Sequence, residues 1–191
     1  MPLHIFEPRY REMVALCLRE DRPFGIVHAS ESKMAEVGTT AWIRRVVTRY
    51  DDGRLDIVCV GETRFRVGRL HRDRSFLAAD VEMIEDADEP DDEDLRQRVI
   101  TQHMRLLEMA GEEPRPGLYD APAPLSFLVA KSAGLRAEPK QALIEAVSEN
   151  ERLVFLADHF ADVLRRVQTA REMRDLAQGD GHSTGFPDLD P

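Results

Sequence analysis

Apolar and polar residues mostly alternate over the first 84 positions, a pattern typical of half-buried β-strands. Residues 7–19 are the exception, because Pro8 suits a first helical turn and apolar residues recur there at helical spacing. We therefore predict one helix over residues 7–19. Apolar runs with the character of strands occupy residues 24–28, 42–50, 55–60, 64–67 and 77–83.

Two hairpins are predicted from these strands. Asp52 and Gly53 separate two of the runs, and an Asp-Gly pair favours a two-residue turn in which both positions take positive φ. The residue pairs expected from such a turn are Tyr50 with Leu55, Thr48 with Ile57, Val46 with Cys59, and Arg49 with Asp56. The second hairpin joins residues 64–67 to residues 77–83. Several short strands with one helix favour a small, partly closed β-barrel.

Beyond residue 94 the apolar period becomes helical. One helix should stop at Gly111, before a proline-rich loop, and its buried stripe comprises Leu95, Val99, Leu106 and Ala110. Two short helices are predicted over residues 126–133 and 139–147. A long helix capped by Asn150 follows, with a buried stripe of Leu153, Leu156, Phe160, Val163, Leu164 and Val167. These helices predict a bundle.

A strongly acidic segment joins the two halves. Residues 85–94 hold eight acids and one proline, as a solvated linker does, and its last acids favour the positive end of the next helix. The alternative is a binding segment for a basic partner. Residues 1–84 carry 14 Lys+Arg against 13 Asp+Glu, and the remainder carries 12 against 23. We therefore predict a barrel subdomain over 1–84, an acidic linker over 85–94, a helical subdomain over 95–177 and a disordered tail over 178–191.

Composition excludes several classes of protein. The 191 residues are 42% hydrophobic, which is too apolar for general disorder, and no apolar run reaches the roughly 18 residues of a membrane helix. Cys17 and Cys59 can form at most one bridge, and neither lies in a metal-binding pattern. We expect a cytoplasmic protein with no membrane partner, no disulfide scaffold and no zinc module.

Several motifs occur together in an order that is specific to one family. Residues 2–11, Pro-Leu-His-Ile-Phe-Glu-Pro-Arg-Tyr-Arg, resemble the opening signature of the amino-terminal substrate-binding domain of the Lon protease family. Further matching segments follow in order at residues 24–27, 37–39, 52–54, 61–67, 76–82, 125–128, 140–145 and 152–153. The resemblance spans residues 2–170 and implies an α+β fold, a PUA-like small β-barrel with one helix followed by a helical bundle subdomain.

The same resemblance implies a function without catalysis. A full Lon protease carries an ATPase with a G-x-x-x-x-G-K-[ST] phosphate loop and a Ser-Lys peptidase, and these 191 residues contain no such loop. Ser126, Lys131 and Ser132 lie on a predicted apolar helix that supplies neither a positioned base nor an oxyanion site. The resemblance therefore implies a stand-alone module, not an enzyme and without a cofactor. Its expected partner is polypeptide, including unfolded or exposed apolar segments.

Other chemically capable residues are expected to have structural roles. No metal site is expected, because the six histidines are scattered outside any metal-ligand pattern: His4, His28, His71, His103, His159 and His182. Four charged residues of the family-like motifs are more often structural than ligand contacts: Glu7, Arg9, Arg64 and Arg66. Interior packing is expected for Trp42, Tyr50, Phe65, Met104, Met109 and Met173. No catalytic or cofactor residue is assigned, and the binding residues stay unknown.

RNA binding is the alternative function. PUA-like barrels serve that purpose, and residues 41–76 hold nine Arg against five Asp+Glu. The whole chain carries a net charge of -10, which repels a phosphate backbone at long range. We therefore favour polypeptide over nucleic acid. The sequence leaves the identity of the polypeptide, the pathway and the oligomeric state open.

The amino terminus departs from the family pattern. In the family, the signature at residues 2–7 follows an apolar strand and a loop, and here Met1 directly precedes it. We expect an open sheet edge near the amino terminus. Either the true start lies upstream, or another element or a second copy masks the edge. In the first case, restoring about 15 to 20 upstream residues, one strand with its loop, should raise the melting temperature.

Overall fold

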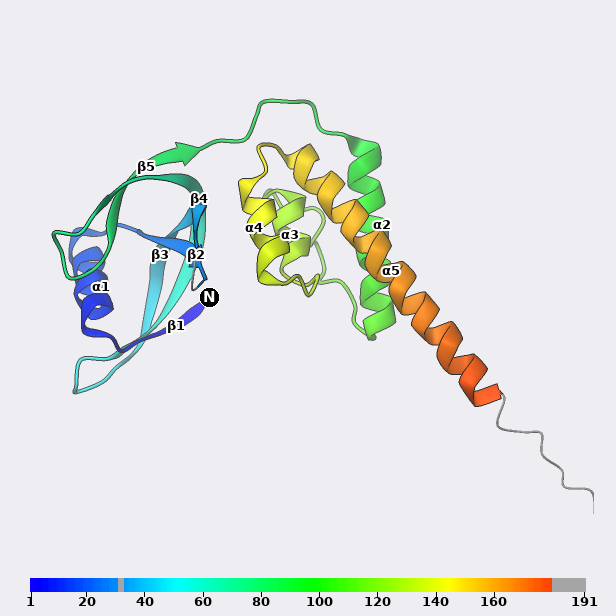
Figure 1. Cartoon of the computed structure of the whole chain (residues 1–191), viewed down its shortest axis with the longest axis horizontal. Coiled ribbons are helices and arrows are strands. Elements are labelled where there is room, and N and C mark those ends of the chain that lie inside the picture. Colours follow the sequence, from blue (N-terminus) through cyan, green and yellow to red (C-terminus); the bar gives the residue numbers. More distant parts are fainter. Residues whose placement is uncertain (31–32, 180–191) are drawn as a thin grey trace, which may run out of the picture. The chain divides into compact units, whose positions relative to one another are not determined.

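A computed structural model of the protein describes residues 1–30 and 33–179, and its chain divides into two compact units. Residues 1–88 and 136–148 form the first, which we call the sheet unit. Residues 89–135 and the chain from residue 149 onward form the second, which we call the helical unit. Strands gather in one unit and most helices in the other, so the fold belongs to the expected α+β class (Figure 1).

Five antiparallel strands make one sheet. In chain order they are β1 (Pro2–Ile5), β2 (Phe24–Ala29), β3 (Met34–Arg49), β4 (Leu55–His71) and β5 (Ala78–Ile84). The spatial order is β1-β4-β3-β2, and β5 pairs with β4 beyond the part that β1 occupies. Among the described residues these pairings form an open path, so the expected barrel is not confirmed.

The amino-terminal segment pairs along one edge of this sheet. The Met1 amino group donates to the carbonyl oxygen of Cys59 at 2.7 Å, and the Cys59 amide donates to the carbonyl oxygen of Met1 at 2.9 Å. Within residues 1–30 and 33–179, β1 has β4 as its only partner strand and stands at the end of the sheet order. An open edge therefore lies at β1.

The core of the sheet unit forms where one helix covers one face of the sheet. Helix α1 (Pro8–Glu20) begins with Pro8 in its first turn, as the sequence predicts. Val14 and Cys17 of α1 are buried against side chains that alternate along the strands, namely Ile5, Phe24, Ala41, Leu55, Ile57 and Cys59. The period-two strand pattern and the helical stripe thus supply the two surfaces of one core.

The register predicted for the first hairpin is wrong. The structure pairs Arg49 with Leu55 and Val46 with Ile57, because Tyr50 to Arg54 form a longer turn than two residues. The Tyr50 amide donates to the carbonyl oxygen of Arg54 at 3.0 Å, and Gly53 alone in this turn has positive φ, at 83°. A type I turn followed by a left-handed glycine has this form. Bulges farther along the two strands shift the register again.

The second hairpin is confirmed in position. Residues 64–67 of β4 pair with residues 81–84 of β5, and β4 continues to His71 before the chain turns. Gly68 lies close to the backbone of β5, since a Cβ at this position would be 3.0 Å from the carbonyl oxygen of Asp80. The register of the two strands shifts between Val67 and Leu70, next to this close approach.

Three helices form the helical unit: α2 (Glu93–Ala110), α3 (Leu125–Ala130) and α5 (Glu149–Gly179). Asp92 caps α2, because its side chain accepts a hydrogen bond from the amide of Leu95 at 2.9 Å, and Gly111 ends the helix with φ 73°. The buried stripe of α2 consists of Val99, His103 and Leu107, so only Val99 of the predicted stripe is buried, whereas Leu95 and Leu106 are half-buried and Ala110 is exposed.

Asn150 does not have the predicted capping role. It lies in the first turn of α5, where its side chain accepts a hydrogen bond from the amide of Asp92 at 3.1 Å and donates one to the carbonyl oxygen of Pro90 at 2.9 Å. Asn150 thus holds the segment before α2. Leu153, Leu156 and Phe160 are buried on α5 as predicted, whereas Val163, Leu164 and Val167 are only half-buried.

Helix α4 (Ala137–Glu145) groups with the sheet, although the sequence prediction placed it in the helical subdomain over 95–177. The side-chain amide of Gln141 donates to the carbonyl oxygen of Val37 on β3 at 3.0 Å, and Leu143 is buried. These contacts are long-range, so the helical period alone could not reveal them. Residues 85–94 are exposed, and Glu93 and Asp94 already belong to α2. Residues 178 and 179 close α5, and the rest of the tail lies outside the described residues.

Candidate functional site

A strip of exposed apolar side chains lies along β5, the residue that precedes it and the adjoining end of β4. Its members, which we call the β5 strip, are Leu70, Leu77, Val81 and Met83, exposed by 37%, 50%, 44% and 53%. Val81 pairs with Val67 and Met83 pairs with Phe65, so both share the face of the sheet on which Phe65 is buried. An uncovered apolar strip beside a buried aromatic ring is unusual for a surface without a partner.

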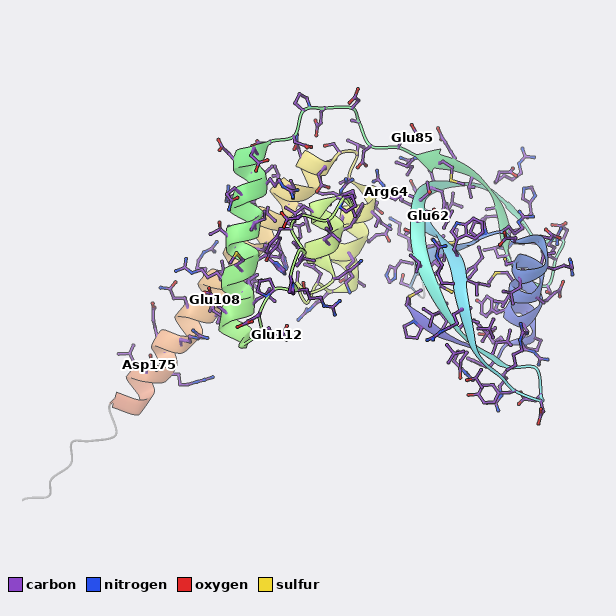
Figure 2. All side chains as sticks on the ribbon, turned by 180° about the vertical axis from the view of Figure 1, so that it is seen from behind. Glu62, Arg64, Glu85, Glu108, Glu112 and Asp175 are labelled. Carbon is purple, nitrogen blue, oxygen red and sulfur yellow. The ribbon has the colours of Figure 1, made fainter. Side chains whose placement is uncertain are left out.

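Acidic side chains occupy the alternate positions of the same strand. Asp80 and Glu82 are exposed on the other face of β5. Glu85 follows the end of the strand (Figure 2). The carboxylate of Asp80 lies 2.9 Å from Nε2 of His71, whereas Glu82 and Glu85 make no ion pair with any described residue. One edge strand therefore presents an apolar face and an acidic face.

Arg64 ties the end of α4 and the start of the acidic segment to β4. Its side chain is 8% exposed, and it donates hydrogen bonds to the carbonyl oxygens of Ile144, at 3.0 Å, and Ala146. It also forms an ion pair with Asp86. A cation this deeply buried, with its donors taken by backbone carbonyls and a carboxylate, acts as a structural clamp.

Two grooves lie in the sheet unit, and both have mixed polarity. The first, of about 540 Å³, lies between α1 and the turn of the β3–β4 hairpin, with Arg11 and Tyr50 among its lining residues. The second, of about 510 Å³, lies between α4 and strands β2 to β4, with Lys33, Glu138 and Gln141 among its lining residues. Neither groove gathers a catalytic set of side chains.

A buried histidine forms the centre of a polar cluster in the helical unit. His103 is fully buried, its Nδ1 lies 2.8 Å from the hydroxyl of Tyr119, and its Nε2 lies 2.9 Å from the hydroxyl of Ser132. The ring also stacks on Phe160. Burial lowers the pKa of His103 below its ordinary value, so the ring is neutral near pH 7.

The sequence analysis missed this cluster, although a signal for it exists. His103 is four residues after Val99 and four before Leu107, so it lies on the buried stripe of α2. A polar residue on such a stripe must find hydrogen-bond partners, because leaving its nitrogens unpaired costs on the order of 1 to 3 kcal/mol. Tyr119 and Ser132 come from two loops, which no local pattern could have assigned.

The contact between Ser132 and His103 resembles a nucleophile with its base, and its surroundings do not support that role. Ser132 follows the carboxyl end of α3, where the carbonyl oxygen of Val129 accepts from both its amide, at 3.1 Å, and its hydroxyl, at 3.3 Å. Carbonyl oxygens and the negative end of a helix dipole disfavour an oxyanion. Tyr119, which orients the ring, is a neutral phenol whose pKa is raised by burial.

Ser126 and Lys131 are not arranged for catalysis either. Ser126 is fully buried, its hydroxyl donates to the carboxylate of Glu149 at 2.6 Å, and it accepts from Nε of Arg152 at 2.9 Å. Arg152 is itself fully buried and packs over the ring of Phe127. Lys131 is exposed. The three residues singled out in the sequence therefore do not converge on one site.

The remaining singled-out residues are scattered over the structure. Nδ1 of His4 lies 2.6 Å from Asp56, the hydroxyl of Tyr50 donates to the same carboxylate at 2.7 Å, and these two bonds lower the pKa of Asp56. Tyr50 is thus exposed and not in the core, whereas Phe65 is buried and Trp42 is half-buried. Met104 and Met173 are exposed, and the interior packing predicted for them is wrong.

The other motif residues make local contacts. Nε of Arg9 donates to Glu7 at 2.8 Å, and Arg66 lies 4.0 Å from Glu36 on the surface. Cys17 and Cys59 are both free and buried, and burial raises the pKa of each thiol. The described part of the chain contains no group of three His, Cys, Asp or Glu side chains that could hold a metal ion. Its helices include none that could cross a membrane.

A family model for the substrate-binding domain of ATP-dependent protease La (LON) matches residues 1–162. The chain belongs to this family. Two Lon proteases resemble it in sequence, one from Methylocella silvestris at 27% identity over 94% of this chain and one from Lawsonia intracellularis at 26% over 87%. The chain spans about a quarter of the length of these relatives, 26% and 22% respectively.

Solved structures of the LON family share its fold. A Lon N-terminal domain protein from Xanthomonas campestris is 25% identical and superposes with a TM-score of 0.64, over 82% of this chain and 86% of that one. The N-terminal domain of a Mycobacterium avium complex Lon protease superposes with a TM-score of 0.61, over 85% of this chain and 90% of that one, at 23% identity. The resemblance read from the ordered motifs is thereby confirmed.

Proposed function

We propose that this protein is a non-catalytic module that binds polypeptide, including unfolded and exposed apolar segments. The observation that carries the proposal is the match of residues 1–162 to a family defined as a protease's substrate-binding domain. The substrates of a protease are polypeptides, so a domain that binds them must recognise chain features that many sequences share. Apolar side chains and the peptide backbone are such features.

Two features of the structure support this proposal. The β5 strip offers exposed apolar side chains beside a strand edge, which is the chemistry that an extended chain can use. The residues with hydrolytic potential, Ser126 and Ser132, are respectively buried and placed at a helix carboxyl end. No phosphate-loop motif occurs in the 191 residues.

We also place the protein in the cytoplasm, where its two free cysteines would remain reduced.

The competing function is RNA binding, and the structure weakens the charge argument for it. Several arginines of residues 41–76 already have acidic neighbours, since Arg54 pairs with Asp52, Arg64 with Asp86 and Arg66 with Glu36. Paired arginines attract a phosphate backbone less than free ones do. A positive surface built from this segment is therefore smaller than its composition suggests.

Fluorescence anisotropy distinguishes the two functions. The protein is titrated into labelled, reduced and carboxymethylated lactalbumin, an unfolded polypeptide, and separately into a labelled mixed-sequence RNA. We expect saturable binding of the polypeptide that persists as salt is raised, because apolar contacts are not screened. Binding of the RNA tighter than micromolar, with a steep loss on adding salt, would overturn the proposal in favour of RNA.

A further inference from the structure

We propose that β5 is the edge at which this protein accepts an extended polypeptide as an added antiparallel or parallel strand, with apolar side chains on one face and basic side chains on the other. This inference rests on the proposed function and names the surface and the chemistry that it would use. It is independent of which protein supplies the segment.

The backbone of β5 is available on one side. Within the described part of the chain, β5 pairs with β4 and with no other strand. Its second edge therefore presents amide and carbonyl groups that no neighbouring strand occupies. An extended chain can satisfy these groups by main-chain hydrogen bonds, which bind any sequence to a similar degree.

The side chains of β5 define what the added strand should carry. A neighbouring strand places its own side chains beside those of β5 on each face. On one face they would meet Val81 and Met83, which continue the apolar surface of Phe65 and Val67 on β4. An apolar residue at every second position would therefore cover the β5 strip.

The opposite face selects for positive charge. Glu82 is exposed and has no ion-pair partner among the described residues. Asp80 is exposed and pairs with His71 alone, and Glu85 is the first residue after the strand. Lysine or arginine at the intervening positions of the added strand would face these carboxylates. The complement of β5 is thus a segment in which apolar and basic residues alternate. On β4, Arg66 lies opposite Glu82, and the buried Arg64 lies opposite Ile84 on the same face.

Charged edge residues are also a common protection against unwanted strand pairing. Two acids on one face exclude acidic segments and a second copy of the same edge, because like charges would lie side by side. They do not exclude a basic segment. The arrangement therefore favours one class of extended chain and disfavours pairing of β5 with itself.

The first test uses peptides of about nine residues, long enough to cover the seven residues of β5. A labelled peptide of alternating valine and lysine is compared with one of alternating valine and glutamate and with one that has the same valines and lysines in two blocks. We expect the alternating valine-lysine peptide to bind the full chain at least about tenfold more tightly than either control. Equal binding of the block peptide would show simple charge attraction and would overturn the inference.

The second test asks whether the backbone takes part. N-methyl groups on alternate residues of the valine-lysine peptide remove the amide donors along one of its edges. Because a strand pairs through one edge, we expect methylation of one alternate set to weaken binding about tenfold or more, and methylation of the other set to leave it within about threefold. Equal effects of the two sets would contradict strand addition.

The third test uses variants of the protein with matched controls. Val81→Thr with Met83→Gln makes the β5 strip polar, whereas Val47→Thr with Val60→Thr alters two valines of similar exposure, 53% and 45%, outside it. We expect about tenfold weaker binding of carboxymethylated lactalbumin for the first pair and wild-type binding for the second. If the protein binds lactalbumin and both pairs bind alike, the β5 site is wrong while the proposed function stands. If even the wild type fails to bind, the proposed function itself fails.

Amide hydrogen exchange on the free protein checks that the edge is open. We expect the amides on the outer side of β5 to exchange fast in the free protein and more slowly with the valine-lysine peptide bound. Protection of all β5 amides in the free protein would show that another part of the chain or a second copy already covers the edge, and it would overturn the inference.

Discussion

Arg64 is a buried cation on β4 whose partners come from two other segments of the sheet unit, the end of α4 and the start of the acidic segment. Replacement by Met would leave the carbonyl oxygens of Ile144 and Ala146 and the carboxylate of Asp86 without this donor. We expect Arg64→Met to lower the free energy of unfolding by about 2 to 4 kcal/mol, since buried acceptors lose their partner. Urea denaturation followed by the fluorescence of Trp42, the one tryptophan of the chain, measures this in the sheet unit.

Arg66 provides the matched control on the same strand. Its side chain is 52% exposed and lies 4.0 Å from Glu36, so the ion pair is screened by solvent. We expect Arg66→Met to change the free energy of unfolding by less than about 0.5 kcal/mol. Equal losses for the two variants would show that Arg64 is not the clamp between β4, α4 and the acidic segment.

Because buried His103 is neutral in the folded protein, the stability of the helical unit should depend on pH. Burial lowers its pKa in the folded protein below the value of about 6.5 that it has when unfolded. Below about pH 6.5 the unfolded chain therefore binds more protons than the folded one. The free energy of unfolding should fall as the pH is lowered through this range, because His103 must stay neutral in the folded protein.

Denaturation midpoints of wild type and His103→Gln, followed by helical circular dichroism, measure this contribution between pH 8 and pH 5. We expect the wild type to lose more stability than the variant over this interval, because glutamine keeps the polar contacts and does not titrate there. Parallel curves for the two proteins would show that His103 does not carry the effect.

At the residue scale, the sequence could predict types of role better than individual contacts. The expectation that Arg64 is structural rests on its motif, but its partners Asp86 and Ala146 lie 22 and 82 residues away. His103 lies on the buried stripe of α2, yet its partners come from loops. Hydrogen bonds between distant segments depend on the packed fold, which the local pattern does not contain.

The pairing of β2 with β3 depends on one glycine. A Cβ on Gly38 would lie 2.6 Å from the carbonyl oxygen of Ile26 and 2.7 Å from the ring of Phe65. We expect Gly38→Ala to lower the free energy of unfolding by about 1 to 3 kcal/mol, because backbone and a buried ring would have to move. Trp42 fluorescence during urea denaturation again measures it.

Gly61→Ala is the control in the same sheet. A Cβ there would meet the methyl group of Thr39 at 3.2 Å and then nothing closer than 3.9 Å, so a small shift of one side chain accommodates it. We expect a change of less than about 1 kcal/mol. A loss as large as that of Gly38→Ala would mean that any added methyl group in these strands is destabilising.

At the scale of elements, periodicity predicted where strands and helices occur, and it failed where a turn or a bulge sets the register. Helix α1 and strands β2 and β5 lie within about two residues of their predicted ranges. The β3–β4 pairs were wrong because the turn from Tyr50 to Arg54 has one left-handed residue, Gly53, in place of two. Turn length decides register, and Asp-Gly alone does not fix it.

The acidic segment should be the first place where a protease acts on the whole chain. Residues 88–91 are exposed, whereas the amide of Ala87 is held by the carbonyl oxygen of Val147 and Asp86 is held by Arg64. We expect an acid-specific protease to cut first after Asp88 or Asp91. Mass spectrometry of the early fragments identifies the bonds that are cleaved, and first cuts within residues 42–67 would contradict this assignment.

The cleaved protein should nevertheless remain one particle in size-exclusion chromatography under native conditions. The carboxyl-terminal fragment would carry α4, which belongs to the sheet unit and contacts β3 through Gln141 and β4 through Arg64. Separate elution of the two fragments without denaturant would show that these contacts do not hold α4 to the sheet.

At the scale of the molecule, the change from strand period to helical period predicted two parts, and the order of the motifs predicted the family. The return of residues 136–148 to the sheet unit could not be predicted in that way. Helix α4 has an ordinary helical pattern, and the feature that decides its place is a set of side-chain bonds to distant backbone. The subdomain boundaries that we drew from composition therefore stay predictions.

Isothermal titration calorimetry tests the central claim, that this chain binds unfolded polypeptide, most directly. Reduced and carboxymethylated lactalbumin is titrated into the full chain, and native lactalbumin with the same sequence serves as the control. We predict saturable binding of the unfolded form with a negative heat-capacity change, the mark of apolar burial, and no measurable heat with the native form. Absence of binding to the unfolded form, or equal binding to both forms, would contradict the claim.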